Sequence, residues 1–208
     1  MTSPHSEWLM LTPAGALQAF AQAAATESDL ALQHLLSSEA ALSADAWLSS
    51  SGHSPELLAD SIDKGWVQRL QQPMQGPDSH LDHFLQHVVA SLSDERKAAL
   101  ASEGGFCLGR AGLEADEAEV LCAAAADYFD FAKRQTRRGW DISRHYVTFH
   151  RESHLLLPSH TFVPLWVDGV GYWLVILGEP LLNNPALVEL LWGIKRAGRR
   201  FGDNAAGL

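Results

Sequence analysis

The order of hydrophobic patterns after residue 77 constrains the fold of this chain more than any other feature. Two short strand-like runs flank the pair Gly104-Gly105, which favours a tight hairpin turn. An alanine-rich helix is predicted over 116–133, with acidic residues in its first turn and bases at its end, as the helix dipole favours. The remaining elements are three strands, at about 144–151, 154–167 with an interruption at Pro158, and 172–177, and two helices, at 79–93 and from Asn183 to Ala197. The predicted order is therefore helix, hairpin, helix, three strands and helix.

The first 75 residues follow a different pattern, in which capping residues punctuate short helices. A helix is predicted over 11–36, beginning after Thr12-Pro13 and broken near 26–29, where capping residues cluster. Ser43 to Leu48 predicts a short helix, and a further helix begins at Ser54-Pro55-Glu56 and ends at Gly65. The alternation of apolar and polar residues over 66–70 is typical of a short strand.

This succession over about residues 11–75 resembles a winged helix. In a DNA-binding member of that class, the helix from Ser54 to Lys64 would enter the major groove. Here that helix carries Glu56, Asp60 and Asp63 against the single base Lys64, and residues 1–75 hold two basic and eight acidic side chains. Such a surface repels DNA, so we expect this part to dock proteins or to pack against the rest of the chain.

A segment rich in proline and glycine, residues 71–78, separates the two patterns and predicts a linker. We therefore expect two domains, a helical winged-helix-like domain with its linker at 1–77 and an α/β domain at 78–208.

The bulk properties exclude several classes of protein. A hydrophobic fraction of 47% with 19% charged residues indicates a globular chain with a packed core, and the net charge of −10 disfavours nucleic acids and anionic membranes as partners. We find neither a signal-peptide pattern nor an apolar run of membrane-spanning length, so the sequence predicts a cytoplasmic protein. The two cysteines, Cys107 and Cys122, lie in apolar surroundings without metal-site spacing and are expected to be reduced core residues.

Two stretches of the C-terminal part carry distinctive motifs. The first is SEGGFCLGRAGLEADEAEVLCAAAADYF at 102–129, where a glycine turn joins two strands and Gly112 leads through an acidic segment into the alanine-rich helix. The second is VTFHRESHLLLPSHTFVPLWVDGVGYWLVILGEP at 147–180, a predicted strand meander. Both stretches resemble those of the roadblock/dynein light-chain family, which is profilin-like in fold. The resemblance covers about residues 79–200 and implies an α+β fold, a five-stranded antiparallel sheet with flanking helices.

The resemblance also implies a partner. Modules of this family are usually dimers in which a helix and a strand of each subunit meet their counterparts, and they commonly bind small Ras-like GTPases as regulators or scaffolds. We expect a homodimer, or a heterodimer with a similar chain, that completes a sheet with one uncovered face and an open edge. The expected interface residues are the small side chains Ala118, Cys122, Ala125 and Ala126, together with Trp166 beside a turn signal.

Candidate catalytic and metal-binding groups are weak. His80, His83 and His87 share a helical face at spacing that suits zinc, but polar-face histidines are usually solvated, so neither a metal nor another cofactor is expected. No nucleophile elbow or phosphate-binding glycine motif occurs, and the setting of Cys107 disfavours a thiolate, so the sequence predicts a non-enzymatic protein. Two other hypotheses stay open: a winged-helix transcriptional regulator with a dimerising sensor domain, and a sensor that binds a small molecule.

Overall fold

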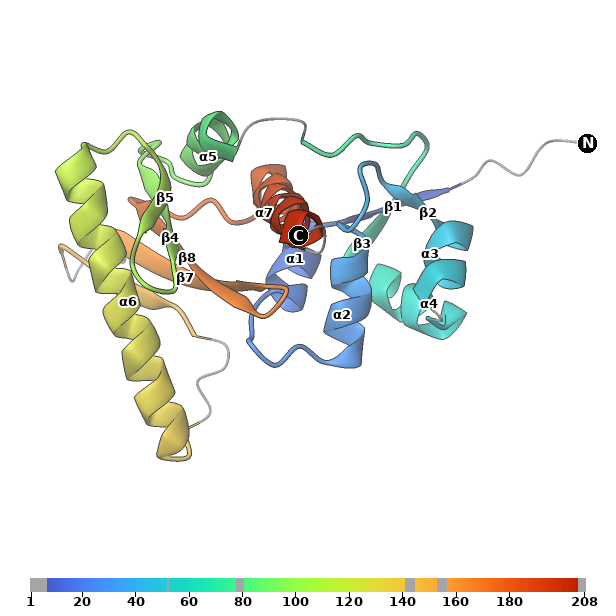
Figure 1. Cartoon of the computed structure of the whole chain (residues 1–208), viewed down its shortest axis with the longest axis horizontal. Helices are drawn as coiled ribbons and strands as arrows, with labels where there is room; N and C mark the ends of the chain where they lie inside the picture. The colour runs from blue at the N-terminus through green and yellow to red at the C-terminus, as the bar shows by residue number, and fades with distance from the viewer. Residues whose placement is uncertain (1–6, 52, 78–80, 141–144, 153–156, 206–208) are drawn as a thin grey trace, which may run out of the picture.

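The chain forms two antiparallel sheets, with helices lying between and around them (Figure 1). The computed structural model describes residues 7–51, 53–77, 81–140, 145–152 and 157–205. A three-stranded sheet of order β2-β1-β3 belongs to the N-terminal part, and a five-stranded sheet of order β5-β4-β8-β7-β6 belongs to the C-terminal part. The predicted α+β class and the five-stranded antiparallel sheet are therefore confirmed.

The C-terminal elements follow the predicted order. They are α5 (Leu81–Ala90), β4 (Ala98–Ser102), β5 (Cys107–Ala111), α6 (Ala115–Arg137), β6 (Val147–Phe149), β7 (His160–Val167), β8 (Val170–Leu177) and α7 (Pro185–Ala205). Both predicted turns form where the backbone needs glycine: Gly105 has a φ of 82° between β4 and β5, and Gly169 has a φ of 80° between β7 and β8. Asp168 precedes Gly169 with a φ of 51°, so Asp-Gly forms the two-residue hairpin turn that matches the twist of the strands.

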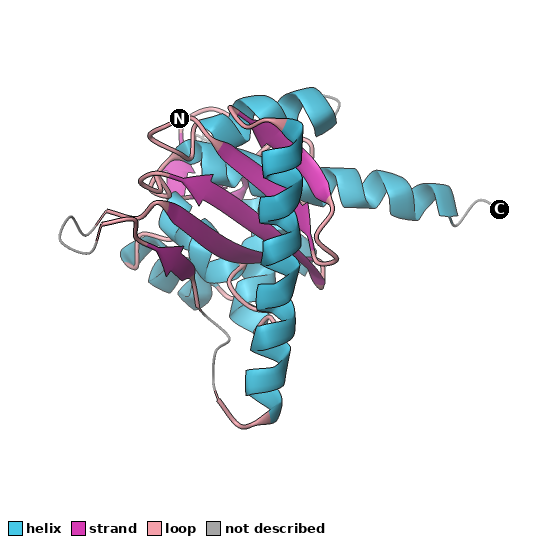
Figure 2. Ribbon diagram, turned by 90° about the vertical axis from the view of Figure 1, so that its left-hand side faces the viewer, coloured by secondary structure: helices cyan, strands magenta, loops and turns pink. Residues whose placement is uncertain are grey.

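The five-stranded sheet is covered by helices on both faces. Leu174 and Ile176 of β8 pack on one side with α5 and α7, while Trp173 and Val175 pack on the other side with α6. Figure 2 shows α6 lying across this second face. The expectation that one face stands uncovered was wrong, because the alternating strand residues are apolar on both sides and each side needs a covering layer.

The N-terminal part contains β1 (Trp8–Leu11), α1 (Pro13–Ala19), α2 (Glu27–His34), β2 (Leu42–Ser43), α3 (Ala44–Ser51), α4 (Pro55–Asp63) and β3 (Val67–Leu70). The predicted caps form: Thr12 accepts a hydrogen bond from the Gly15 amide, Ser54 accepts one from Leu57, and Thr26 opens α2 with a capping box. The sequence did not predict β1, because four consecutive apolar residues show neither helical nor strand periodicity.

The core is continuous across the boundary expected at residue 77. A single cluster of buried residues joins Leu9, Phe20 and Trp47 of the N-terminal part to Leu100 and Trp192 of the C-terminal part. The Trp192 indole donates a 2.8 Å hydrogen bond to the Ser38 carbonyl. Figure 1 shows the reason, since α7 lies directly beside α1. The two parts therefore pack as one unit.

The segment expected to be a free linker is instead held in place. Ala40 forms an antiparallel bridge with Gln75, and the Gly76 amide donates a 2.7 Å hydrogen bond to the Glu39 carbonyl. A Cβ on Gly76 would lie 2.7 Å from the Trp192 ring, so only glycine lets the chain pass this closely. The guanidinium of Arg196 also donates to the Pro77 carbonyl at 2.6 Å.

Trp192→Ala should lower the free energy of unfolding by about 3–5 kcal/mol, the usual cost of emptying a buried aromatic site. The N-terminal and C-terminal parts share this core, so both should unfold together. Urea denaturation of the wild type, followed by circular dichroism, should therefore show a single transition. Trp140→Ala is the control, because this side chain is 61% exposed and should change stability by less than about 0.5 kcal/mol. Two separate wild-type transitions would contradict the shared core.

Candidate interaction surface

Strand β6 forms one edge of the five-stranded sheet. Val147 pairs with Phe162 and Phe149 pairs with His160 on β7, while no described strand pairs with the outer side of β6. An edge strand presents backbone N–H and C=O groups that a further strand can use. This edge is therefore open to a second polypeptide.

An apolar stripe on α6 continues the edge of the sheet. Val120, Ala124, Tyr128 and Phe131 recur at intervals of four, four and three residues, which places them along one side of the helix. The Tyr128 ring packs 4.9 Å from the Phe162 ring and 6.1 Å from the Phe149 ring, so the stripe contacts β6 at Tyr128. We name Val120, Tyr128, Phe131, Val147 and Phe149 the α6–β6 surface.

Much of the α6–β6 surface is in contact with solvent. Val120 is 70% exposed, Phe149 is 47% exposed and Phe131 is 43% exposed. Single exposed apolar residues are common, but a contiguous set that joins a helix to an open sheet edge is typical of a protein-binding surface. Burying these side chains against a partner would remove apolar area from water.

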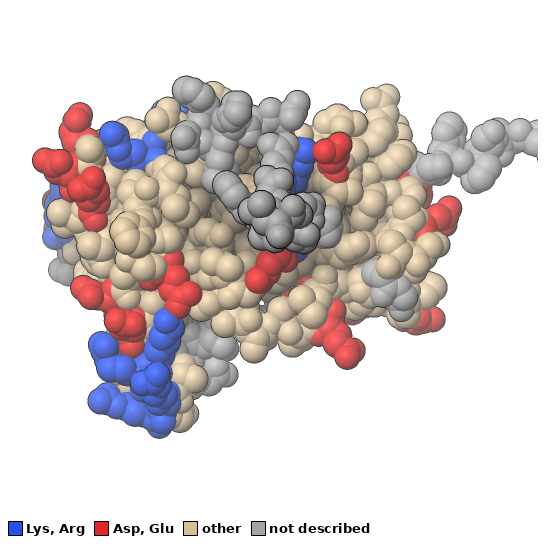
Figure 3. Space-filling view, viewed as in Figure 1, with Lys and Arg blue, Asp and Glu red and all other residues tan. Residues whose placement is uncertain are grey.

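The C-terminal end of α6 is strongly basic in an otherwise acidic chain. Lys133, Arg134, Arg137 and Arg138 are all exposed there, and Figure 3 shows their side chains gathered at the end of the helix. Only Lys133 forms an ion pair within the described part of the chain, with Glu103. This end of the surface therefore suits an acidic partner.

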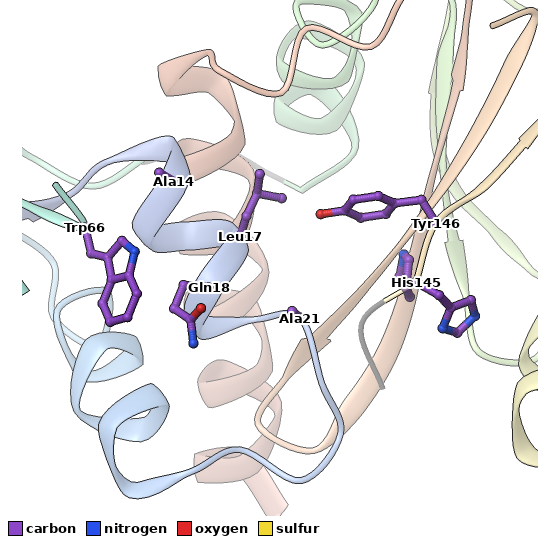
Figure 4. A pocket seen from close by; sticks show the side chains of 8 residues that line it. Ala14, Leu17, Gln18, Ala21, Trp66, His145 and Tyr146 are labelled. Atoms are coloured by element: carbon purple, nitrogen blue, oxygen red, sulfur yellow. The ribbon is translucent and has the colours of Figure 1, made fainter. Parts of the chain in front are cut away.

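Two cavities lie between the N-terminal part and the sheet, next to this surface. The smaller one, of about 330 Å³, is lined by α1, by Trp66 and by the residues that lead into β6. Figure 4 shows the Tyr146 hydroxyl pointing toward Leu17 of α1. The larger cavity, of about 480 Å³, lies between the loop joining α1 to α2 and the second half of α6, and His145 and Pro164 line both.

The buried carboxylate of Asp29 holds the α1–α2 loop that borders both cavities. It accepts 3.0 Å hydrogen bonds from the side chains of Gln18 and Gln22 and further bonds from the amide and hydroxyl of Thr26. Burial raises the pKa of this carboxyl, but the hydrogen bonds from Thr26, Gln18 and Gln22 outweigh burial and leave the pKa below its ordinary value of 3.8. The ionised form of Asp29 therefore stabilises the loop.

The structure places most of the expected interface residues in the core of the chain itself. Ala118, Cys122 and Ala125 are completely buried between α6 and its own sheet, so a partner that docks on α6 contacts a different face of the helix. Ala126 and Trp166 are half-buried, and the Trp166 ring packs 5.2 Å from Phe129. The small side chains on this face let α6 pack closely against the sheet of its own chain.

The sequence analysis did not predict the exposed apolar stripe on α6, although the spacing of its residues indicates it. The spacing of Val120, Tyr128 and Phe131 is visible in the sequence, yet alanine dominates α6 and drew attention to the buried side of the helix. Phe149 belongs to a strand of only three residues, too short to show which of its faces is buried.

The cysteines and histidines singled out in the sequence lie in different settings. Burial raises the pKa of the Cys122 thiol to about 12, with smaller contributions from Cys107 and Glu119. His80 lies outside the described residues, as does the side chain of His83, while His87 is exposed on α5. Elsewhere in the described ranges, no three metal-ligating side chains come together.

Across the described helices, none has both the length and the apolar character that crossing a bilayer requires.

Comparison with known proteins gives one structural likeness. No family model matches the sequence, and no curated protein matches it. Among solved structures, the chain is similar to a Roadblock/LC7 domain from Streptomyces avermitilis, with 18% sequence identity and a TM-score of 0.41, covering 59% of this chain and 99% of that one. A likeness of this degree says nothing about partners or activity.

Asp29→Asn should lower the free energy of unfolding at pH 7 by about 1–3 kcal/mol, because the amide leaves buried donors without an acceptor. The folded-state pKa of Asp29 is depressed, so its contribution is complete above pH 3.8 and is lost as the pH falls through the folded-state value. The difference between wild type and variant, measured by urea denaturation from pH 7 to pH 3, should therefore shrink toward pH 3. Asp63→Asn, at an exposed position, is the control, and a pH-independent difference would contradict the role of the charge.

Proposed function

We propose that this chain is a dimeric, non-enzymatic scaffold or regulator that acts by binding other proteins, with a small Ras-like GTPase as its partner. The observation that carries the proposal is the α6–β6 surface, where an open sheet edge and exposed aromatic side chains adjoin. The sequence resemblance to the roadblock/dynein light-chain family supports the same reading.

Dimerisation through the α6–β6 surface would satisfy the open edge of the sheet. If β6 of one subunit lies antiparallel to β6 of its partner about a two-fold axis, the two sheets become one. Tyr128 of α6 adjoins this edge through its contact with Phe149, so the same axis would bring the α6 helices of the two subunits toward each other, with Val120 and Phe131 exposed on them. Two copies of this chain would form such a dimer. A similar chain with the same edge strand could replace one copy and form a heterodimer through the same contact.

The partner is proposed from the resemblance and from charge. The basic end of α6 gives an acidic chain a positively charged region, which would steer an acidic surface toward it. The GTPase itself is inherited from the family resemblance, and this chain would act on it by positioning it rather than by supplying a catalytic group.

We propose that the N-terminal part, which resembles a winged helix, docks proteins rather than DNA. Helix α4 exposes the carboxylates of Glu56, Asp60 and Asp63, and the base of Lys64 is paired with Asp60 at 2.7 Å. A recognition helix with this charge would be repelled by phosphates. An electrophoretic shift with sequence-specific competition would favour the transcriptional alternative instead.

Val120→Glu and Phe149→Asp should each convert a dimer into a 22.7 kDa monomer, because each puts a charge into an apolar contact. Sedimentation equilibrium would measure the change, and we expect the dimer to weaken by at least about tenfold, as loss of a central interface residue does.

Phe106→Glu provides the matched control. Phe106 is 75% exposed at the β4–β5 turn, near the opposite edge of the sheet, so its substitution should leave the dimer intact. A wild-type chain that stays monomeric at high micromolar concentration would refute dimerisation. A dimer broken only by Phe106→Glu would place the interface elsewhere.

Binding to the proposed partner can be measured with purified Ras-like GTPases of the native host, loaded with GDP or with a non-hydrolysable GTP analogue. At least one should bind the immobilised chain, and charge reversal at Arg134 and Arg138 should weaken that binding while Val170→Glu at the β7–β8 turn should not. Failure of every GTPase to bind would remove this part of the proposal and leave dimerisation standing.

A further inference from the structure

The larger of the two cavities is bounded by elements far apart in the sequence. Gln22 to Ala24 of the α1–α2 loop form one wall, and Ala132, Thr136 and Arg137 of α6 form another. Pro164, Trp166 and Trp173 of the sheet close its base. Its volume of about 480 Å³ falls within the usual range for small-molecule sites, about 300–1,000 Å³.

Three aromatic rings form a fixed apolar wall in this cavity. Phe129 contacts Trp166 with ring centroids 5.2 Å apart and Trp173 with centroids 4.9 Å apart, both edge to face. Edge-to-face contacts hold the rings in defined orientations. A flat aromatic ligand can therefore pack on this wall without first ordering it.

The polar groups of the cavity complement an anion. Arg137 lines the cavity and forms no ion pair within the part of the chain that the structure describes, and its planar guanidinium matches a carboxylate with two parallel donors. Lys133 adds a second cation, partly neutralised by Glu103.

We infer that this cavity binds a small organic anion with an aromatic body and a carboxylate. The aromatic body packs against Phe129 and Trp166, and the carboxylate pairs with Arg137 at the rim. The ligand contacts both the α1–α2 loop and α6, and it thereby adds a link between the N-terminal and C-terminal parts.

Isothermal titration calorimetry of the full chain with naphthylacetate tests this inference, with tryptophan fluorescence as a second readout. Wild type should bind one equivalent saturably and should bind the neutral analogue naphthylacetamide much more weakly. Arg137→Gln should weaken the binding of naphthylacetate by about tenfold, the factor that corresponds to one charge-assisted hydrogen bond.

Arg134→Gln is the matched control, because Arg134 is also exposed on the same helix and does not line the cavity. It should leave binding unchanged. Ala132→Leu, which fills the cavity without changing charge, should weaken the binding of naphthylacetate while keeping the wild-type melting temperature within a few degrees. The inference is overturned if naphthylacetate gives no saturable heat, if the amide binds equally well, or if both arginine variants weaken binding alike.

Discussion

Helix α7 packs on the five-stranded sheet and on α1 at once, and the rest of the structure depends on this double contact. Its residues Leu187, Leu190 and Leu191 are completely buried in the core that joins both parts of the chain. Gly193 permits the contact with α5, because a Cβ there would lie 2.2 Å from the Phe84 ring. The short three-stranded sheet and its helices thus gain a hydrophobic neighbour that they could not supply themselves.

The same packing explains why the cavities lie where they do. Helix α1 packs against α7, which lies on the sheet. The loop after α1 is held next to β7 by a 2.9 Å hydrogen bond from the Trp166 amide to the Phe20 carbonyl. The second half of α6 extends beyond the sheet, as Figure 2 shows. The larger cavity lies between this half of the helix and the α1–α2 loop. A cavity with aromatic walls and a cationic rim results from these two placements.

The α6–β6 surface has a different origin: the two faces of the five-stranded sheet are covered to different extents. One face is covered by two helices and the N-terminal part, whereas the other is covered by α6 alone. A single helix shields the central strands β4 and β8 but leaves the edge strand β6 half open. Phe149 at that margin is therefore exposed in the single chain.

The sequence by itself determined the helices, their caps and the two hairpin turns, because these depend on interactions within a few residues. Thr12, Ser54 and the Asp168-Gly169 pair act at the positions where local chemistry placed them. Only the tertiary structure decided which side of α6 is buried, that β1 is a strand, and that residues 74–77 are fixed rather than free. Those outcomes depend on contacts between residues far apart in the chain, such as Gly76 with Trp192, and local periodicity carries no information about such contacts.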